Sequence, residues 1–182
     1  VHAEALARLE EEGVQGIAFN IMFSDSDLNN PDSDALFDEI ATELSKTTFP
    51  FIRLNPQNDK LSKLTLGSIP SVRFENDEVK KKTIAAIIPY FQGTRDKLGV
   101  ANQTPDDDGL VRRYPINLSE EGFAIPSLAK NVLSFSEKSS IDPNGNEIIL
   151  NWRNKKGDYQ RVSFSDFFMS EDDASVSLEN KL

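Results

Sequence analysis

The stretch QGIAFNIMF at residues 15–23 decides the fold class, because it is almost continuously apolar. A run of this length without polar alternation is typical of a strand buried on both faces, as in a parallel sheet. Its polar exceptions are Asn20 within the run and Ser24 and Asp25 just after it. Ligands of parallel α/β sheets bind at the carboxyl ends of the strands, so we expect Ser24 and Asp25 at a binding edge.

The segments on either side of this strand predict the helices that a parallel sheet needs. Residues 3–12 form an amphipathic helix that ends at Gly13, and residues 36–44 carry a helical apolar stripe. Residues 49–54 are expected to be the adjacent parallel strand. We therefore predict a single α/β domain over residues 1–182, with a mixed, largely parallel central sheet flanked by helices. Residues 170–182 are acidic and weakly patterned, which indicates a loose or truncated end.

A turn signal stands in the second half of the chain. Asp108 and Gly109 lie between two β-prone segments, residues 98–102 and 110–116. Asp-Gly between such segments is a strong hairpin signal. We therefore expect an additional β-hairpin around residues 98–116.

Charge and composition exclude several classes of function. The chain has 30 acidic and 20 basic residues and a formal net charge of −10, so no nucleic-acid partner is expected. It contains no cysteine and therefore has no disulfide or thiolate nucleophile. The single histidine, His2, lies beside the N-terminus, so a Ser-His-Asp triad or a multi-histidine metal site is not expected.

The sequence contains no membrane-spanning segment of about 20 apolar residues and no signal peptide. Val1 is not a natural start residue. We therefore expect the chain to be an excised fragment of a longer protein.

The charges at residues 106–113 are the most conspicuous polar feature. Three adjacent aspartates repel one another unless a cation or a base neutralises them, and Arg112 and Arg113 follow directly. An EF-hand loop is excluded, because Val-Arg-Arg-Tyr stands where that loop needs its glutamate. Two interpretations remain open: a divalent cation near Asp106 and Asp108, or a tight turn tethered by an arginine. No other cofactor is expected.

The two arginines are adjacent on a predicted strand and would therefore point to opposite faces of the sheet. Either Arg112 or Arg113 could enter a pocket and pair with Asp25 or bind an anionic ligand. The alternative is a partly buried ion pair of structural value only. Asn151 and Arg153 end another predicted strand, at residues 147–152, and would be neighbours of such a pocket.

Several blocks occur in a fixed order along the chain. Residues 16–24 read GIAFNIMFS, residues 98–102 read LGVAN and residues 106–113 read DDDGLVRR. With Pro115 and the segments 126–129, 149–153 and 162–166, they resemble the second CHASE-type family (cyclase/histidine-kinase-associated sensory extracellular domains). The sequence departs from the family in two places. Asn20 stands where the family usually has an aspartate, and the family's next strand is not reached before Leu182.

The resemblance implies a periplasmic sensory domain of a bacterial inner-membrane receptor, with transmembrane helices before and after it. The output of such receptors is commonly an adenylate or guanylate cyclase, a histidine kinase, a serine/threonine kinase or a cyclic-di-GMP enzyme. The resemblance does not identify a ligand.

Our first hypothesis is a non-catalytic sensor that detects a small-molecule or protein signal and passes it across the membrane. A change in domain pairing, for example within a homodimer, would transmit the signal. The candidate binding residues are Asn20, Ser24, Asp25, Asp106, Asp108, Arg112, Arg113, Asn151 and Arg153. Two alternatives remain open: a metal-dependent hydrolase that uses Asp25 with Asp106 or Asp108, and a dimerisation or interaction domain with no small-molecule ligand.

Overall fold

The computed structural model describes residues 1–135, 147–150 and 161–169. Helix α1 (His2–Glu11) ends at the predicted cap, since Gly13 has a φ of +77°. Strand β1 (Ile17–Ala18) follows, and helix α2 (Pro31–Glu43) leads to strand β2 (Thr47–Arg53). The predicted order of helix, strand, helix and strand is therefore confirmed.

Strand β2 is the centre of a mixed sheet. It pairs in parallel with β1, through Ile17 opposite Thr47, and in parallel with β5 (Leu98–Val100). Its far end pairs antiparallel with β4 (Ala86–Ile87). A central mixed sheet with helices against it confirms the predicted α/β class.

Two smaller sheets complete the strands of the described residues. One has the order β3-β8-β7 and the other pairs β6 with β9. Their bounds are β3 (Arg73–Phe74), β6 (Arg113–Pro115), β7 (Asn117–Glu120), β8 (Phe123–Pro126) and β9 (Glu147–Ile149). The remaining elements are helices α3 (Asp77–Lys80), α4 (Leu128–Ser134) and α5 (Phe164–Met169), and 3-10 turns η1 (Pro56–Leu61), η2 (Leu66–Ser68) and η3 (Gln92–Lys97).

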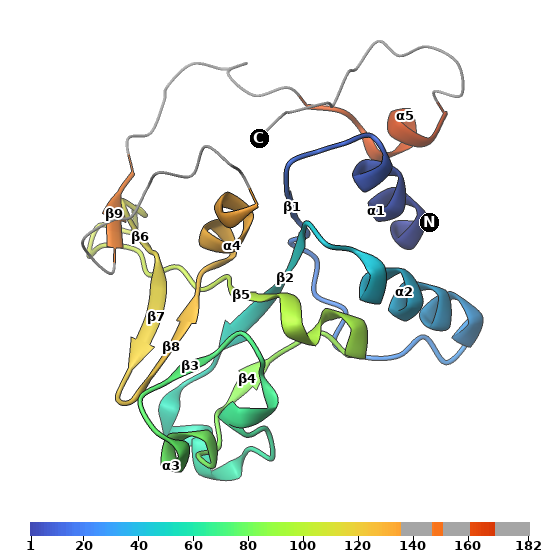
Figure 1. Ribbon diagram of the computed structural model, residues 1–182. Helices are drawn as coiled ribbons and strands as arrows, with labels where there is room; N and C mark the ends of the chain where they lie inside the picture. Colours follow the sequence, from blue (N-terminus) through green and yellow to red (C-terminus); the bar gives the residue numbers. More distant parts are fainter. Residues whose placement is uncertain (136–146, 151–160, 170–182) are drawn as a thin grey trace.

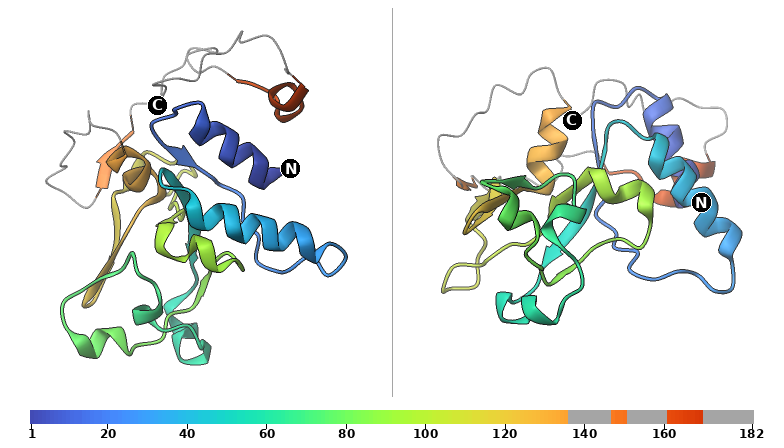
Figure 2. Two further views of the ribbon diagram at one scale, coloured as in Figure 1. Left: turned by 45° about the vertical axis from the view of Figure 1, so that its right-hand side comes forward. Right: turned by 60° about the horizontal axis from the view of Figure 1, so that its bottom comes forward.

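The helices cover the central strands from different sides. In Figure 1, α1 and α2 lie side by side, and α4 lies on the other side of β1 and β2. The start of α2 and the β6–β9 pair stand at opposite ends of the molecule in all three views of Figures 1 and 2. No helix in the described part of the chain is long and apolar enough to cross a membrane.

The core forms around β2. Phe49 and Phe51 of this strand are almost fully buried, as are Leu98 of β5 and Ile125 of β8. Burial of each such side chain contributes about 2 kcal/mol of hydrophobic free energy. This packed centre fixes the ends of β1 and β2, where polar side chains begin.

The expectation that residues 15–23 form one long buried strand is wrong. The apolar run 15–23 forms only the two-residue strand β1, and Asn20 is exposed rather than buried within a strand. The run leaves the sheet early because its phenylalanines turn to an aromatic cluster with α2 instead of continuing beside β2.

The predicted hairpin around residues 98–116 is also not formed. The Asp-Gly turn itself is present, with Gly109 at a φ of +81° and its N–H donated to the Asp106 carbonyl at 2.8 Å. However, β5 pairs with β2 and β6 pairs with β9. The hairpin lies further on, between β7 and β8, where Gly122 has a φ of +89°. A Cβ at this glycine would approach Val79 Cγ2 to 2.7 Å.

Candidate functional site

An aromatic cluster forms the floor of the candidate site beside the start of α2. Phe37 of α2 and Phe91 have ring centroids 4.6 Å apart, and Phe23 lies edge-on to both, at 5.4 and 6.2 Å. Phe37 and Phe91 are buried. Aromatic pairs in this geometry add to the hydrophobic effect of burial, so the floor is a rigid surface.

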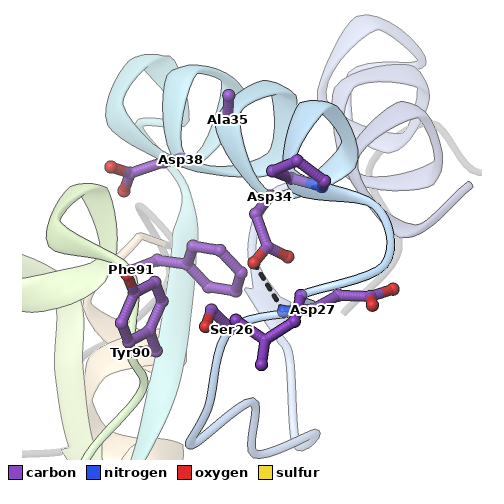
Figure 3. A pocket seen from close by; sticks show the side chains of 9 residues that line it. Ser26, Asp27, Asp34, Ala35, Asp38, Tyr90 and Phe91 are labelled. Carbon is purple, nitrogen blue, oxygen red and sulfur yellow. Dashed lines mark hydrogen bonds between the residues drawn. The ribbon is translucent and has the colours of Figure 1, made fainter.

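A cavity of about 420 Å³ lies beside this floor and shares only Phe91 with it, between α2, the loop before it and the segment before η3 (Figure 3). Its lining residues are Ser26, Asp27, Leu28, Pro31, Asp34, Ala35, Asp38, Tyr90 and Phe91. The volume is within the range of natural small-molecule sites. We call it the α2 cavity.

Two carboxylates of the α2 cavity are fixed by backbone N–H groups. Asp34 Oδ2 accepts a 2.7 Å hydrogen bond from the Asp27 N–H, which Figure 3 shows as a dashed line. Asp38, one helical turn along, accepts a 2.7 Å bond from the Gly93 N–H through Oδ1. A Cβ on Gly93 would lie 2.5 Å from the Asp38 carbonyl oxygen, so this close approach requires glycine.

A second cavity of about 500 Å³ adjoins the first and shares Asp27, Asp34 and Phe91 with it. His2 and Asp25 also line this second cavity. The His2 ring packs 5.4 Å from that of Phe23 and 5.1 Å from that of Phe164. Its Nδ1 atom is buried and has no hydrogen-bond partner among the described residues.

The structure therefore places part of the predicted site here. Asp25 lines the second cavity, and the Ser24 hydroxyl donates a 2.9 Å hydrogen bond to Asp25 Oδ2. Asn20 is exposed and lines neither cavity. The rule that ligands bind at strand ends thus pointed to a loop that lines a cavity, although not to the carboxylates of α2.

The acidic loop lies elsewhere and is neutralised by its own arginines. Arg112 donates to Asp108 through both terminal nitrogens, at 2.8 and 2.6 Å, and to Asp106 at 3.1 Å. Arg113 lies 3.7 Å from Asp106 and 3.0 Å from Glu147. Arg112 lowers the pKa of Asp108, and Asp108 in turn raises the pKa of Arg112. This is the geometry of a tethered turn.

The residues of the predicted site therefore lie in two separate regions of the molecule. Arg112 precedes β6 instead of lying within it, so both arginines reach the same Asp106, and the expectation of opposite faces is wrong. Neither arginine pairs with Asp25, because the β6 end of the molecule is opposite the start of α2 (Figures 1 and 2). Asn151 and Arg153 lie outside the described residues.

A second arginine cluster was not anticipated from the sequence. Arg53, at the end of β2, donates to both oxygens of Asp59 at 2.6 and 2.8 Å and to both oxygens of Glu120 at 2.7 and 2.9 Å. Only 5% of its side chain is exposed. These contacts raise the pKa of Arg53, with Glu120 as the largest cause, and Arg53 lowers that of Asp59. The five N–H donors of the guanidinium bind oxygens of Asp59, Glu120 and the Ala85 carbonyl. This cluster therefore has a structural role.

The described residues contain no group of three or more histidine, aspartate or glutamate side chains arranged to hold a metal ion. The oxygens of Asp106 and Asp108 that a cation would need accept hydrogen bonds from Arg112. What the α2 cavity offers instead is a set of separate carboxylates above an aromatic floor.

A family model described as CHASE2 domain matches residues 1–182, which is the whole chain. No curated protein and no solved structure matches it.

Proposed function

The chain belongs to the CHASE2 domain family, and from this premise we propose that it is the sensory domain of a membrane-bound signalling protein and detects a small molecule in the α2 cavity. CHASE2 domains are extracellular sensory domains of signalling proteins and are not catalytic. The match over the whole chain is the observation that carries the proposal. We propose the α2 cavity as the location of the sensory role.

The arrangement of the α2 cavity supports a role in signalling. The cavity joins α2 to the segment around Tyr90 and Phe91, and the adjoining cavity reaches α1 through His2. A ligand that bridges these elements would favour one spacing of α1 and α2 over another, which is how binding energy shifts a conformational equilibrium. We propose that α1 and α5 carry this shift towards flanking membrane helices and an output domain such as a cyclase or a histidine kinase.

The geometry gives less support to the alternative of a metal-dependent hydrolase. Asp25 lies beside the start of α2, whereas Asp106 and Asp108 lie beside β6 at the opposite end of the molecule. One metal ion cannot bridge carboxylates placed in this way.

A thermal-shift screen of the chain tests the proposal. Any compound that binds only the native state raises the unfolding midpoint by mass action. We expect compounds that stabilise the natural chain but not Ala35→Trp, because Ala35 is exposed on α2 and a larger side chain there would fill the cavity. Glu39→Trp is the control, since Glu39 is exposed on the same helix but lines neither cavity.

The screen has clear outcomes. A compound that loses its effect in Ala35→Trp and keeps it in Glu39→Trp supports the α2 cavity as a sensory site. A broad library without such a compound, tested on a well-folded sample, would contradict small-molecule sensing at this place.

A further inference from the structure

The charge of the α2 cavity is not balanced by the protein. Asp34 and Asp38 each use one carboxylate oxygen to accept a backbone N–H, and neither forms an ion pair with a described residue. Asp27 also lines the cavity and forms no ion pair with a described residue. The remaining oxygens are therefore open to a cationic partner in the cavity.

Other acidic clusters of the described chain contrast with this one. Asp106 and Asp108 are paired with Arg112, and Asp59 and Glu120 are paired with Arg53. Asp77 and Glu78 have Lys80 and Lys81 one turn along α3. In these three clusters the protein itself supplies the cation. At the α2 cavity it does not.

Among the described residues, Arg95 is a cationic side chain close to the cavity. Arg95 interacts electrostatically with Asp38, and burial lowers the pKa of Arg95. It nevertheless forms no ion pair with Asp38, and its Nη2 atom is 3.5 Å from the Tyr90 carbonyl oxygen. Its charge offsets part of the field at Asp38 and leaves Asp34 and Asp27 unbalanced.

The wall opposite the carboxylates is aromatic. Tyr90 is 50% exposed, and its ring lies beside that of Phe91, with centroids 5.6 Å apart. Figure 3 shows both rings facing the space below α2, towards which the Asp34 carboxylate points. Aromatic faces attract cations, and this attraction is stronger where water is excluded. An ammonium group between Asp34 and Tyr90 would form an ion pair with the carboxylate and a cation–π contact with the ring.

A further unsatisfied atom lies in the adjoining cavity. The buried His2 Nδ1 has no partner among the described residues, although buried polar atoms are generally hydrogen-bonded. Asp34 lines both cavities, so a ligand that reaches Asp34 also comes to the cavity that His2 lines.

We propose that the α2 cavity binds a small organic cation of the aliphatic amine class, with an ammonium group against Asp34 and Asp38 and its carbon chain against Tyr90 and Phe91. The described residues contain no group of three or more histidine, aspartate or glutamate side chains that could hold a metal ion, which favours a cation with a carbon body over a bare metal ion. This inference rests on the proposed sensory role of the same cavity and adds the chemical class of its ligand.

The test is isothermal titration of the chain with three probes that share a four-carbon body. They are 1,4-diaminobutane, the neutral 1,4-butanediol and the anionic butanedioate. We expect the diamine to bind at least about tenfold more tightly than the diol, because a charge-assisted hydrogen bond is worth more than a neutral one. Equal affinity for diamine and diol would overturn the proposal.

Variants locate the binding. We expect Asp34→Asn and Asp38→Asn each to weaken diamine binding about tenfold, and Tyr90→Leu to weaken it about two- to fivefold. Asp107→Asn removes the same charge from an exposed position of the acidic loop and should change the affinity less than about twofold. If Asp107→Asn weakens binding as much as Asp34→Asn, the diamine only condenses on an acidic surface, and the proposal is wrong.

The two proposals fail separately. Suppose that the diamine does not bind, and that the diol or butanedioate binds and loses its binding in Ala35→Trp. This result would refute the amine class and would still support the cavity as a sensory site. Absence of any compound sensitive to Ala35→Trp in the wider library would refute the sensory site itself.

Discussion

Two clusters in this protein have the same composition and differ in burial. Arg53 binds Asp59 and Glu120, and Arg112 binds Asp106 and Asp108, so each consists of one arginine with two carboxylates. The side chain of Arg53 is 5% exposed, whereas that of Arg112 is 44% exposed. We call them the buried trio and the exposed trio.

The difference shows that an ion pair has no fixed value. In the exposed trio, water solvates the charges almost as well as the partners do, and exposed pairs contribute little to stability. In the buried trio, removing one partner leaves charges that water reaches poorly, which is costly. We therefore expect the same substitution to lower the free energy of unfolding much more in the buried trio than in the exposed trio.

The largest expected effect is that of Arg53→Met. It leaves Asp59 and Glu120 facing each other without their cation, and it also removes the hydrogen bond to the Ala85 carbonyl oxygen. We expect the free energy of unfolding to fall by about 3 kcal/mol, measured by urea denaturation. Arg53→Lys should lose an intermediate amount, because lysine keeps the charge but cannot form two paired contacts. A loss no larger than that of Arg112→Met would show that burial does not separate the trios.

The next effect is that of Asp59→Asn, and it depends on pH. Arg53, and to a lesser extent the Ala85 N–H, lowers the pKa of Asp59 from its ordinary value of 3.8. The stability that the carboxylate contributes is therefore present above that value and is lost as the pH falls through the lowered native pKa. At neutral pH we expect Asp59→Asn to cost about 1–2 kcal/mol.

The same reasoning gives the check on Asp59→Asn. As the pH falls through the lowered native pKa of Asp59, the natural chain also loses the interaction, so the difference in stability between the two proteins should narrow. Urea denaturation at neutral and acidic pH measures it. A difference that stays constant with pH would mean that Asp59 acts by packing and not through its charge.

The exposed trio could be found from the sequence, and the buried one could not. Asp106, Asp108 and Arg112 lie within seven residues of one another, so their charges alone indicated either a cation site or a turn tethered by an arginine. Arg53 ends an apolar run, and its partner Glu120 is 67 positions away. Only the pairing of β2 with its neighbours brings those charges together.

The same difference between contacts close in sequence and contacts distant in sequence applies to the fold and to the candidate site. Local patterns predicted helices α1 and α2 and the parallel pairing of β1 with β2. The hairpin was placed wrongly, because Asp108-Gly109 determines a turn but not which strands pair beyond it. The signal for the true hairpin was Gly122, after Glu121. No sequence pattern singled out Asp34 and Asp38, and only the folded chain brings Tyr90 to the same cavity.

A smaller effect is expected for Arg112→Met. Asp106 and Asp108 remain solvated when Arg112 is removed, and the turn keeps its Gly109 to Asp106 backbone hydrogen bond. We expect the urea midpoint to change only slightly, with diamine binding at the α2 cavity unaffected. A loss comparable to that of Arg53→Met would indicate that the turn depends on its arginine for folding.

The smallest effect is the salt dependence of the two couplings, measured by double-mutant cycles. One cycle combines Arg112→Met with Asp108→Asn and the other combines Arg53→Met with Glu120→Gln. At about 1 M salt the Debye length falls to about 3 Å, so the coupling in the exposed trio should vanish. The coupling in the buried trio should largely persist, because ions cannot enter the space between Arg53 and Glu120, which lie 2.7 Å apart with 5% of the arginine side chain exposed. If the coupling between Arg112 and Asp108 also survived high salt, the bidentate geometry of this pair would matter more than its solvation. Burial would then not be the property that distinguishes the trios.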